Sequence, residues 1–138
     1  MFDTLHWNLG ELSAVFSIAA DTQGRLYLGN INSLVELNPH KKYLKIHRVL
    51  NSTADSLGCG QINKLFIDSK GNLWIGGRTG LWLFNRKNQK FINFSAKAPS
   101  LNTSIHDIKE DPNGNLWIAT GRNGLQKFTL EQHTCLSY

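Results

Sequence analysis

The sequence predicts an all-β fold, and three observations support this. One phrase occurs three times: "DTQGRLYLGNINSL" from Asp21, "DSKGNLWIGGRTGL" from Asp68 and "DPNGNLWIATGRNGL" from Asp111. Short runs of β-branched and aromatic residues alternate with turn-forming Asp, Asn and Gly. The aspartates are spaced 47 and then 43 residues apart. Four short strands in a unit of about this length are typical of a propeller blade, so the chain is predicted to be a β-propeller segment of three four-stranded antiparallel blades.

The second repeat shows the expected elements in order. The apolar run over 62–68 predicts the first strand. The turn DSKGN follows, because its Asp can accept backbone N–H groups and its Gly can adopt a positive φ. Further strands are expected at 73–77, 81–85 and 90–94. In the third repeat the third and fourth strands are expected at 126–130 and 134–138, and in the first repeat the fourth strand is expected at 43–47.

Large apolar side chains are expected between neighbouring blades, because a single blade cannot bury both of its own faces. The residues assigned to this role are Trp74, Trp82, Phe84, Trp117 and Phe128.

The blade boundaries are expected at residues 9–50, 51–97 and 98–138, after the outer strand of a preceding blade within residues 1–8. Propellers have roughly four to eight blades, so three blades leave two alternatives open. The chain is either a segment of a longer propeller, or it closes a ring by self-association, in which two copies would supply six blades.

Composition and charge narrow the range of possible functions. The 138 residues are 41% hydrophobic and 18% charged, as in a globular domain. The net charge of +5 favours anionic partners, but the basic residues are scattered and no aromatic–basic motif accompanies them, so no nucleic acid is predicted. No apolar run reaches the length of a membrane helix and no signal peptide is visible, so no membrane contact is expected. The histidines and the two cysteines lack metal-ligand spacing, so no metal or cofactor is predicted.

The phrase "DSKGNLWIGGRTGLWLFN" resembles the two-component regulator propeller repeat, whose pattern is a strand ending in Asp, then G-N-L-W-I-G-T, then G-L and an aromatic–Asn ending. "DPNGNLWIATGRNGLQKF" resembles it with one extra residue before its Arg, whereas the first repeat departs at Arg25, Tyr27 and Ser33. The resemblance covers residues 9–138. It implies a periplasmic sensor module of bacterial hybrid two-component histidine kinases, especially of gut Bacteroidetes, that recognises glycan fragments.

Candidate ligand-binding residues lie in loops at one end of the blades, where propellers usually bind ligands near the central axis. Arg78 and Arg122 occupy equivalent loop positions on adjacent blades, and Asn32 is expected at this position in the first repeat. Two arginines can form a cationic rim for a carboxylate or sulfate. Further candidates at the start of the innermost strands are Asn63, Lys64 and His106, with Gln61 and Ser104 beside them. All of these are alternatively ordinary turn residues or a solvated channel wall.

The prediction is therefore a non-catalytic, ligand-sensing propeller segment of a bacterial two-component sensor in the periplasm. Its expected ligand is an oligosaccharide, which the arginines would allow to be acidic. The alternative is a structural or protein–protein interaction propeller. An enzyme, such as a propeller-fold lyase, is the weakest interpretation because no acid–base pair stands out and no catalytic residue is assigned.

Overall fold

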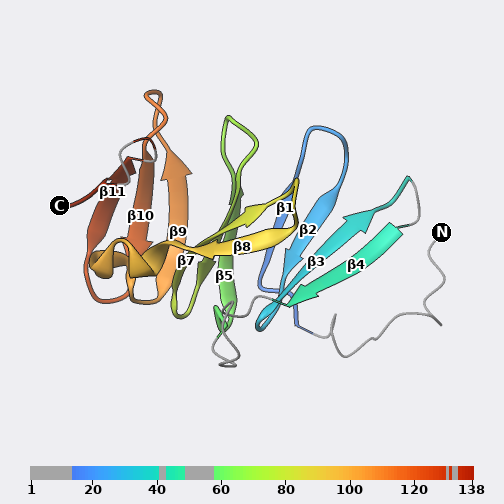
Figure 1. Cartoon of the computed structure of the whole chain (residues 1–138), viewed down its shortest axis with the longest axis horizontal. Helices are drawn as coiled ribbons and strands as arrows, with labels where there is room; N and C mark the ends of the chain where they lie inside the picture. The colour runs from blue at the N-terminus through green and yellow to red at the C-terminus, as the bar shows by residue number, and fades with distance from the viewer. Residues whose placement is uncertain (1–13, 41–42, 49–57, 130, 132–133) are drawn as a thin grey trace.

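The strands form three separate four-stranded sheets. The computed structural model describes residues 14–40, 43–48, 58–129, 131 and 134–138. In each sheet every strand pairs antiparallel with the next along the chain. The three sheets stand next to one another along the long axis of the molecule (Figure 1). The predicted all-β class and the three four-stranded blades are confirmed; the strand expected in residues 1–8 lies outside the described residues.

Each sheet lies within one of the three predicted blade ranges. The first blade contains β1 (Ser17–Ala20), β2 (Leu26–Gly29), β3 (Ser33–Asn38) and β4 (Tyr43–Arg48). The second contains β5 (Ile62–Ile67), β6 (Leu73–Gly77), β7 (Gly80–Asn85) and β8 (Lys90–Asn93). The third contains β9 (Ile105–Glu110), β10 (Leu116–Thr120), β11 (Leu125–Thr129) and β12 (Thr134–Ser137).

The first strands of the blades, β1, β5 and β9, lie side by side (Figure 1). The fourth strands, β4, β8 and β12, form the opposite edges of their sheets. Each blade therefore presents two sheet faces. The second blade lies between the other two and must bury both of its faces, which explains why β6 is buried along its whole length.

The segment after β8 departs from the prediction. The fourth strand of the second blade was expected to reach Phe94 with no helix following. Instead, β8 ends at Asn93, and two short 3₁₀ helices follow, η3 (Phe94–Ala96) and η4 (Pro99–Leu101). The side chain of Asn93 accepts a hydrogen bond from Ser95 N–H at 2.9 Å, which caps η3, and Pro99 starts η4 at a position where proline is tolerated.

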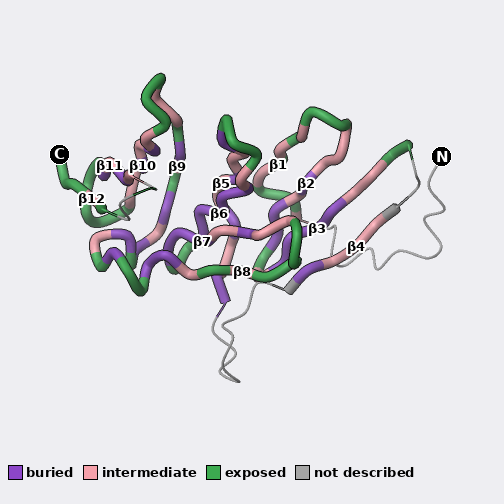
Figure 2. Tube along the Cα trace, turned by 45° about the horizontal axis from the view of Figure 1, so that its top comes forward, coloured by how far each residue is buried: buried purple, intermediate pink, exposed green. Residues whose placement is uncertain are grey.

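Two hydrophobic clusters fill the two spaces between blades. Figure 2 shows where the buried residues lie along the strands of the three blades. Tyr27 and Leu34 of the first blade pack with Ile62 and Leu65 of the second. The second cluster contains Trp74 and Leu81 of the second blade together with Phe94, Ile105, Ile108, Leu116, Ile118 and Phe128. The interblade role predicted for Trp74, Trp82, Phe84 and Phe128 is confirmed, since none is more than 2% exposed.

Trp117 is the exception, because it belongs to neither cluster of the described residues, so its place between two blades stays a prediction. It is only half-buried, because its face of the third blade has no further blade of the described chain against it. Its ring instead stacks on Tyr138, with ring centroids 5.1 Å apart.

Candidate functional site

The loops that carry the two candidate arginines lie at the same end of neighbouring blades, opposite the Asp–Gly turns (Figure 1). The loop between β6 and β7 is fixed by a hydrogen bond from Arg78 N–H to the Gln61 carbonyl at 3.0 Å. The loop between β10 and β11 is fixed in the same way, by Gly121 N–H bonding to the Ser104 carbonyl at 2.7 Å. Backbone bonds to the preceding loops therefore set the directions from which both arginines project.

Arg78 and Arg122 line one hollow of about 500 Å³, formed between the second and third blades. The other residues around it are Thr79, Asn102, Thr103, Ser104 and Gly121. The wall thus combines two guanidinium groups with hydroxyl and amide groups. No ion pair of the described residues involves either arginine. The hollow is a cationic, hydrogen-bonding surface, which suits a polar anion.

Asn63 and Lys64 connect blades and do not line this hollow. Asn63 Nδ2 donates to the Ile105 carbonyl at 2.9 Å and lies 3.3 Å from Ser104 Oγ. Lys64 Nζ lies 3.4 Å from Asp107 Oδ1. Both polar side chains are therefore engaged by the third blade, although each was a candidate for ligand contact.

Asn32 also has a structural role. Its backbone has a positive φ of 53°, and its side-chain oxygen accepts a hydrogen bond from Gly60 N–H at 2.6 Å. Counted from the aspartate of each turn, the residue equivalent to Arg78 is Ile31, so Asn32 lies one position further along the loop. The first blade therefore adds no residue to the hollow that the two arginines share.

His106 is exposed at the start of β9. A Cβ atom placed on Gly121 would lie 3.1 Å from His106 Nε2, so the imidazole is close to one wall of the hollow. The sequence did not single out Thr79, Asn102 or Thr103. The signal that could have found the last two is the polar run "NTS" between Leu101 and Ile105, which η4 turns toward the arginine loops.

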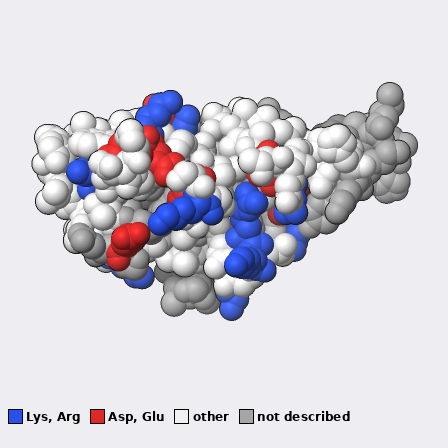
Figure 3. Space-filling model, turned by 90° about the horizontal axis from the view of Figure 1, so that it is seen from above, with Lys and Arg blue, Asp and Glu red and all other residues white. Residues whose placement is uncertain are grey.

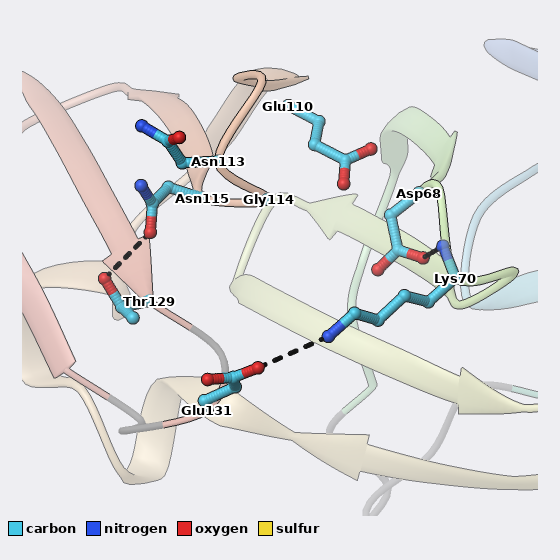
Figure 4. Close-up of a pocket in the computed structure, with 8 residues that line it drawn as sticks. All are labelled: Asp68, Lys70, Glu110, Asn113, Gly114, Asn115, Thr129 and Glu131. Atoms are coloured by element: carbon cyan, nitrogen blue, oxygen red, sulfur yellow. Dashed lines mark hydrogen bonds and ion pairs between the residues drawn. The ribbon is translucent and has the colours of Figure 1, made fainter.

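A smaller hollow of about 110 Å³ lies at the opposite end, between the Asp–Gly turns of the second and third blades (Figure 4). Its charged groups are already paired. Lys70 Nζ lies 3.5 Å from Glu131 Oε1, and Ser69 donates from its N–H and hydroxyl to the two Glu110 oxygens at 2.8 and 2.6 Å. These contacts link two blades and leave little charge for a ligand. Viewed from above, several basic residues lie together near the middle of this end, whereas acidic and uncharged residues separate the others (Figure 3).

The described part of the chain shows neither a metal-binding cluster nor a membrane-spanning helix. No group of three or more His, Cys, Asp or Glu side chains there is arranged to hold a metal ion. No helix in those ranges has the length and apolar character needed to cross a membrane.

The three blade-like sheets and their closely packed interfaces define a β-propeller segment. More particularly, the model of the two-component regulator propeller family matches residues 56–79 and 99–122, which lie in the second and third repeats. The resemblance seen in the sequence is thereby confirmed. Both matched stretches contain one of the two arginines of the hollow.

Three bacterial proteins are similar to this chain in sequence or in fold. Histidine kinase P4 of Formosa agariphila is 32% identical in an alignment of 83 residues that covers 55% of this chain and 6% of the relative. The extracellular domain of a hybrid two-component system from B. thetaiotaomicron is 28% identical with a TM-score of 0.76, over 99% of this chain and 18% of that domain. The extracellular domain of a one-component system from the same organism shares the fold, with 24% identity and a TM-score of 0.74 over 99% and 18% of the two chains. The chain thus spans a small part of the relatives it matches.

Proposed function

We propose that this chain is a non-catalytic, ligand-sensing propeller segment of a periplasmic two-component sensor, and that it recognises an oligosaccharide bearing carboxylate or sulfate groups. The observation that carries the proposal is the hollow between the second and third blades. Arg78 and Arg122 line it from neighbouring blades, and neither has a carboxylate partner among the described residues. Similarity to extracellular domains of two-component systems supports the sensor role and the location.

The chemistry of the wall favours an acidic sugar over a neutral one. Each guanidinium presents five N–H donors in a planar fork that fits the oxygens of a carboxylate or sulfate. Hydroxyl and amide groups of Thr79, Asn102 and Ser104 line the same space and match the hydroxyls of a sugar ring. A neutral oligosaccharide can use only the second set of groups, so we expect it to bind more weakly.

The residues around the hollow also support binding without chemical change. Glycoside hydrolysis generally uses two carboxyl groups on either side of the scissile bond. The lining residues include neither Asp nor Glu. We therefore expect the bound sugar to be released without being cleaved, as a sensor requires.

Isothermal titration calorimetry with matched oligosaccharides tests this function. We expect uronate-containing or sulfated oligosaccharides to bind, neutral ones of equal length to bind more weakly, and binding to weaken as salt concentration rises. Arg78→Gln and Arg122→Gln should each lower the affinity about tenfold or more, since each removes charge-assisted hydrogen bonds.

The matched control is Lys87→Gln, which removes the same charge from an exposed turn outside the hollow. It should leave the affinity unchanged. Equal binding of acidic and neutral sugars, or equal effects of all three substitutions, would contradict the proposed site.

A further inference from the structure

A further hollow, of about 300 Å³, lies at the end of the second blade that carries its Asp–Gly turn. It is formed by residues 70–72 of the β5–β6 turn and by residues 83–87, which end β7 and begin the β7–β8 turn. Three of these residues are cations, Lys70, Arg86 and Lys87, and none is Asp or Glu. Basic side chains gather near the middle of this end of the molecule (Figure 3). We call this space the turn hollow.

The repeat itself does not require cations at these three positions. Their counterparts in the first repeat, 47 residues earlier, are Gln23, Pro39 and His40. Their counterparts in the third repeat are Asn113, Leu130 and Glu131. All three blades form the same four strands, so strand pairing does not depend on the cations of the second blade. A role other than folding is therefore open to them.

Local hydrogen bonds fix the backbone that carries these cations. Asn85 Oδ1 accepts from Lys87 N–H at 2.9 Å and from Asn88 N–H at 3.3 Å, which closes the β7–β8 turn. In the β5–β6 turn, Asp68 Oδ1 accepts from Lys70 N–H at 2.9 Å. Because the two turns are already ordered, a ligand held between them would order little more than the side chains it contacts.

The positive charge of the turn hollow is only partly compensated. No ion pair of the described residues involves Lys87. Lys70 Nζ lies 3.5 Å from Glu131 Oε1, but the two side chains are 63% and 81% exposed, so water screens the pair and an anion can replace it. Arg86 Nη2 lies 3.5 Å from Asp21 Oδ2, which offsets the third charge. Two lysines are therefore available to an anionic ligand.

We propose that the turn hollow binds the phosphate group of a small soluble phosphate monoester, at a site separate from the hollow of Arg78 and Arg122. A phosphate monoester has a charge of about −1.5 to −2 at neutral pH and three acceptor oxygens, which suits cations that converge from two turns. Arg86 can donate from its planar fork, and the lysines act as point charges. Leu83 and Phe84 add apolar lining for the organic part of the ester.

The same phosphate chemistry occurs in the headgroup of phosphatidic acid. The position of the hollow decides between the two sources. Its cations come from two neighbouring turns, and the ligand must enter between these turns to reach all of them. This arrangement favours a small molecule over a headgroup that is held in a membrane surface.

An NMR titration of the full 138-residue chain tests the site. It uses the Arg78→Gln/Arg122→Gln double variant, so that the other hollow cannot hold the phosphate; both arginines are exposed. Glucose 6-phosphate, glucose 6-sulfate and glucose share one sugar but differ in charge. We expect the amide signals of Lys70 and Lys87 to shift with glucose 6-phosphate, the sulfate to bind about fivefold more weakly or less, and glucose to cause no shift.

Lys70→Gln and Lys87→Gln, added singly to this background, should each weaken the binding of glucose 6-phosphate about fivefold or more. The matched control is Lys109→Gln, which removes the same charge from an exposed position of β9 outside the turn hollow and should leave the binding unchanged. Equal effects of the three substitutions, or no shift with glucose 6-phosphate, overturn the proposal.

Cosedimentation with vesicles that contain phosphatidic acid separates the two sources of phosphate. We expect no more binding than to phosphatidylcholine vesicles. Binding to the acidic vesicles that Lys87→Gln abolishes, without a shift by glucose 6-phosphate, would assign the turn hollow to a membrane and overturn the small ester. Failure of this site leaves the oligosaccharide site untested by these titrations, because both arginines of that site are replaced; calorimetry on the unsubstituted chain tests it separately.

Discussion

Trp74 Nε1 donates a hydrogen bond to Asp68 Oδ2 at 2.9 Å, which joins the β5–β6 turn to a fully buried indole in the space between blades. The other carboxylate oxygen of Asp68 accepts from the N–H groups of Lys70 and Asn72, both at 2.9 Å. One carboxylate therefore closes the turn and positions the interblade tryptophan. The third blade repeats the bond between Trp117 and Asp111 at 2.9 Å.

Asp68→Ala is expected to destabilise the protein by roughly 3 kcal/mol. The substitution removes several hydrogen bonds to a charged acceptor and leaves the buried indole N–H of Trp74 without a partner. Urea denaturation followed by tryptophan fluorescence measures the change. Glu131→Ala is the control, because its side chain is 81% exposed and its pair with Lys70 should contribute less than about 1 kcal/mol. If the two variants lose similar amounts of unfolding free energy, the Asp68–Trp74 hydrogen bond contributes no more to stability than an exposed ion pair.

Asp111 should make the stability depend on pH in the acid range. The hydrogen bond from Trp117, followed by the N–H groups of the turn, lowers the pKa of Asp111 from 3.8 to about 2. Because the folded pKa lies below the unfolded one, the stabilisation is complete above pH 3.8 and is lost as the pH falls toward 2. Trp117→Phe removes the main cause and should raise the pKa of Asp111 toward 3.8, which an NMR titration of the carboxyl carbon would detect. An unchanged pKa in this variant would rule out the indole as the cause.

The strands and turns could be predicted from the sequence because the same pattern of apolar and turn-forming residues occurs three times. The loop positions of Arg78 and Arg122 followed from the same periodicity. Contacts that depend on tertiary structure could not be predicted in this way: η3 arises from the capping side chain of Asn93, and Asn63 was engaged by a carbonyl of the next blade. Periodicity places a residue on an element, but it does not show which group of a neighbouring element satisfies that residue.

The first repeat shows this limit most clearly. Tyr27 stands where the other repeats have tryptophan, so no indole N–H reaches Asp21 Oδ2, and the side chain of Asp21 is only 3% exposed. Arg86 approaches this oxygen from the second blade, with Nη2 at 3.5 Å, and its guanidinium lies 5.6 Å from the centroid of the Tyr27 ring. A cation from the next blade thus partly replaces the missing local donor.

Arg86→Gln is therefore expected to cost about 2 kcal/mol, because it leaves a buried carboxylate with weaker compensation. The cost should be smaller in a Tyr27→Trp background, where an indole N–H can bond Asp21 Oδ2 as Trp74 bonds Asp68. A double-mutant cycle from urea unfolding isolates this coupling from any overpacking that the larger ring causes. If the two substitutions are additive, the proposed exchange of partners is wrong.

Gly80 and Gly114 both have positive φ, at 135° and 83°, but their surroundings differ. A Cβ on Gly80 would lie 1.7 Å from Ser95 Oγ, whereas a Cβ on Gly114 would meet nothing within 4 Å. Ser95 is buried, and its hydroxyl accepts a hydrogen bond from Leu81 N–H at 3.0 Å, so the side chain cannot move away without breaking that bond.

Gly80→Ala should therefore destabilise by about 3 kcal/mol or more, since it adds a steric clash and a lost hydrogen bond to the backbone strain. Gly114→Ala carries only the strain of a left-handed alanine, about 1–2 kcal/mol. Thermal and urea denaturation of both variants compare the two costs. Because η3 supplies Ser95, Gly80→Ala should also disturb the packing of the second blade against the third. Equal destabilisation by the two substitutions would mean that backbone strain alone, and not contact with Ser95, determines the requirement for glycine at the start of β7.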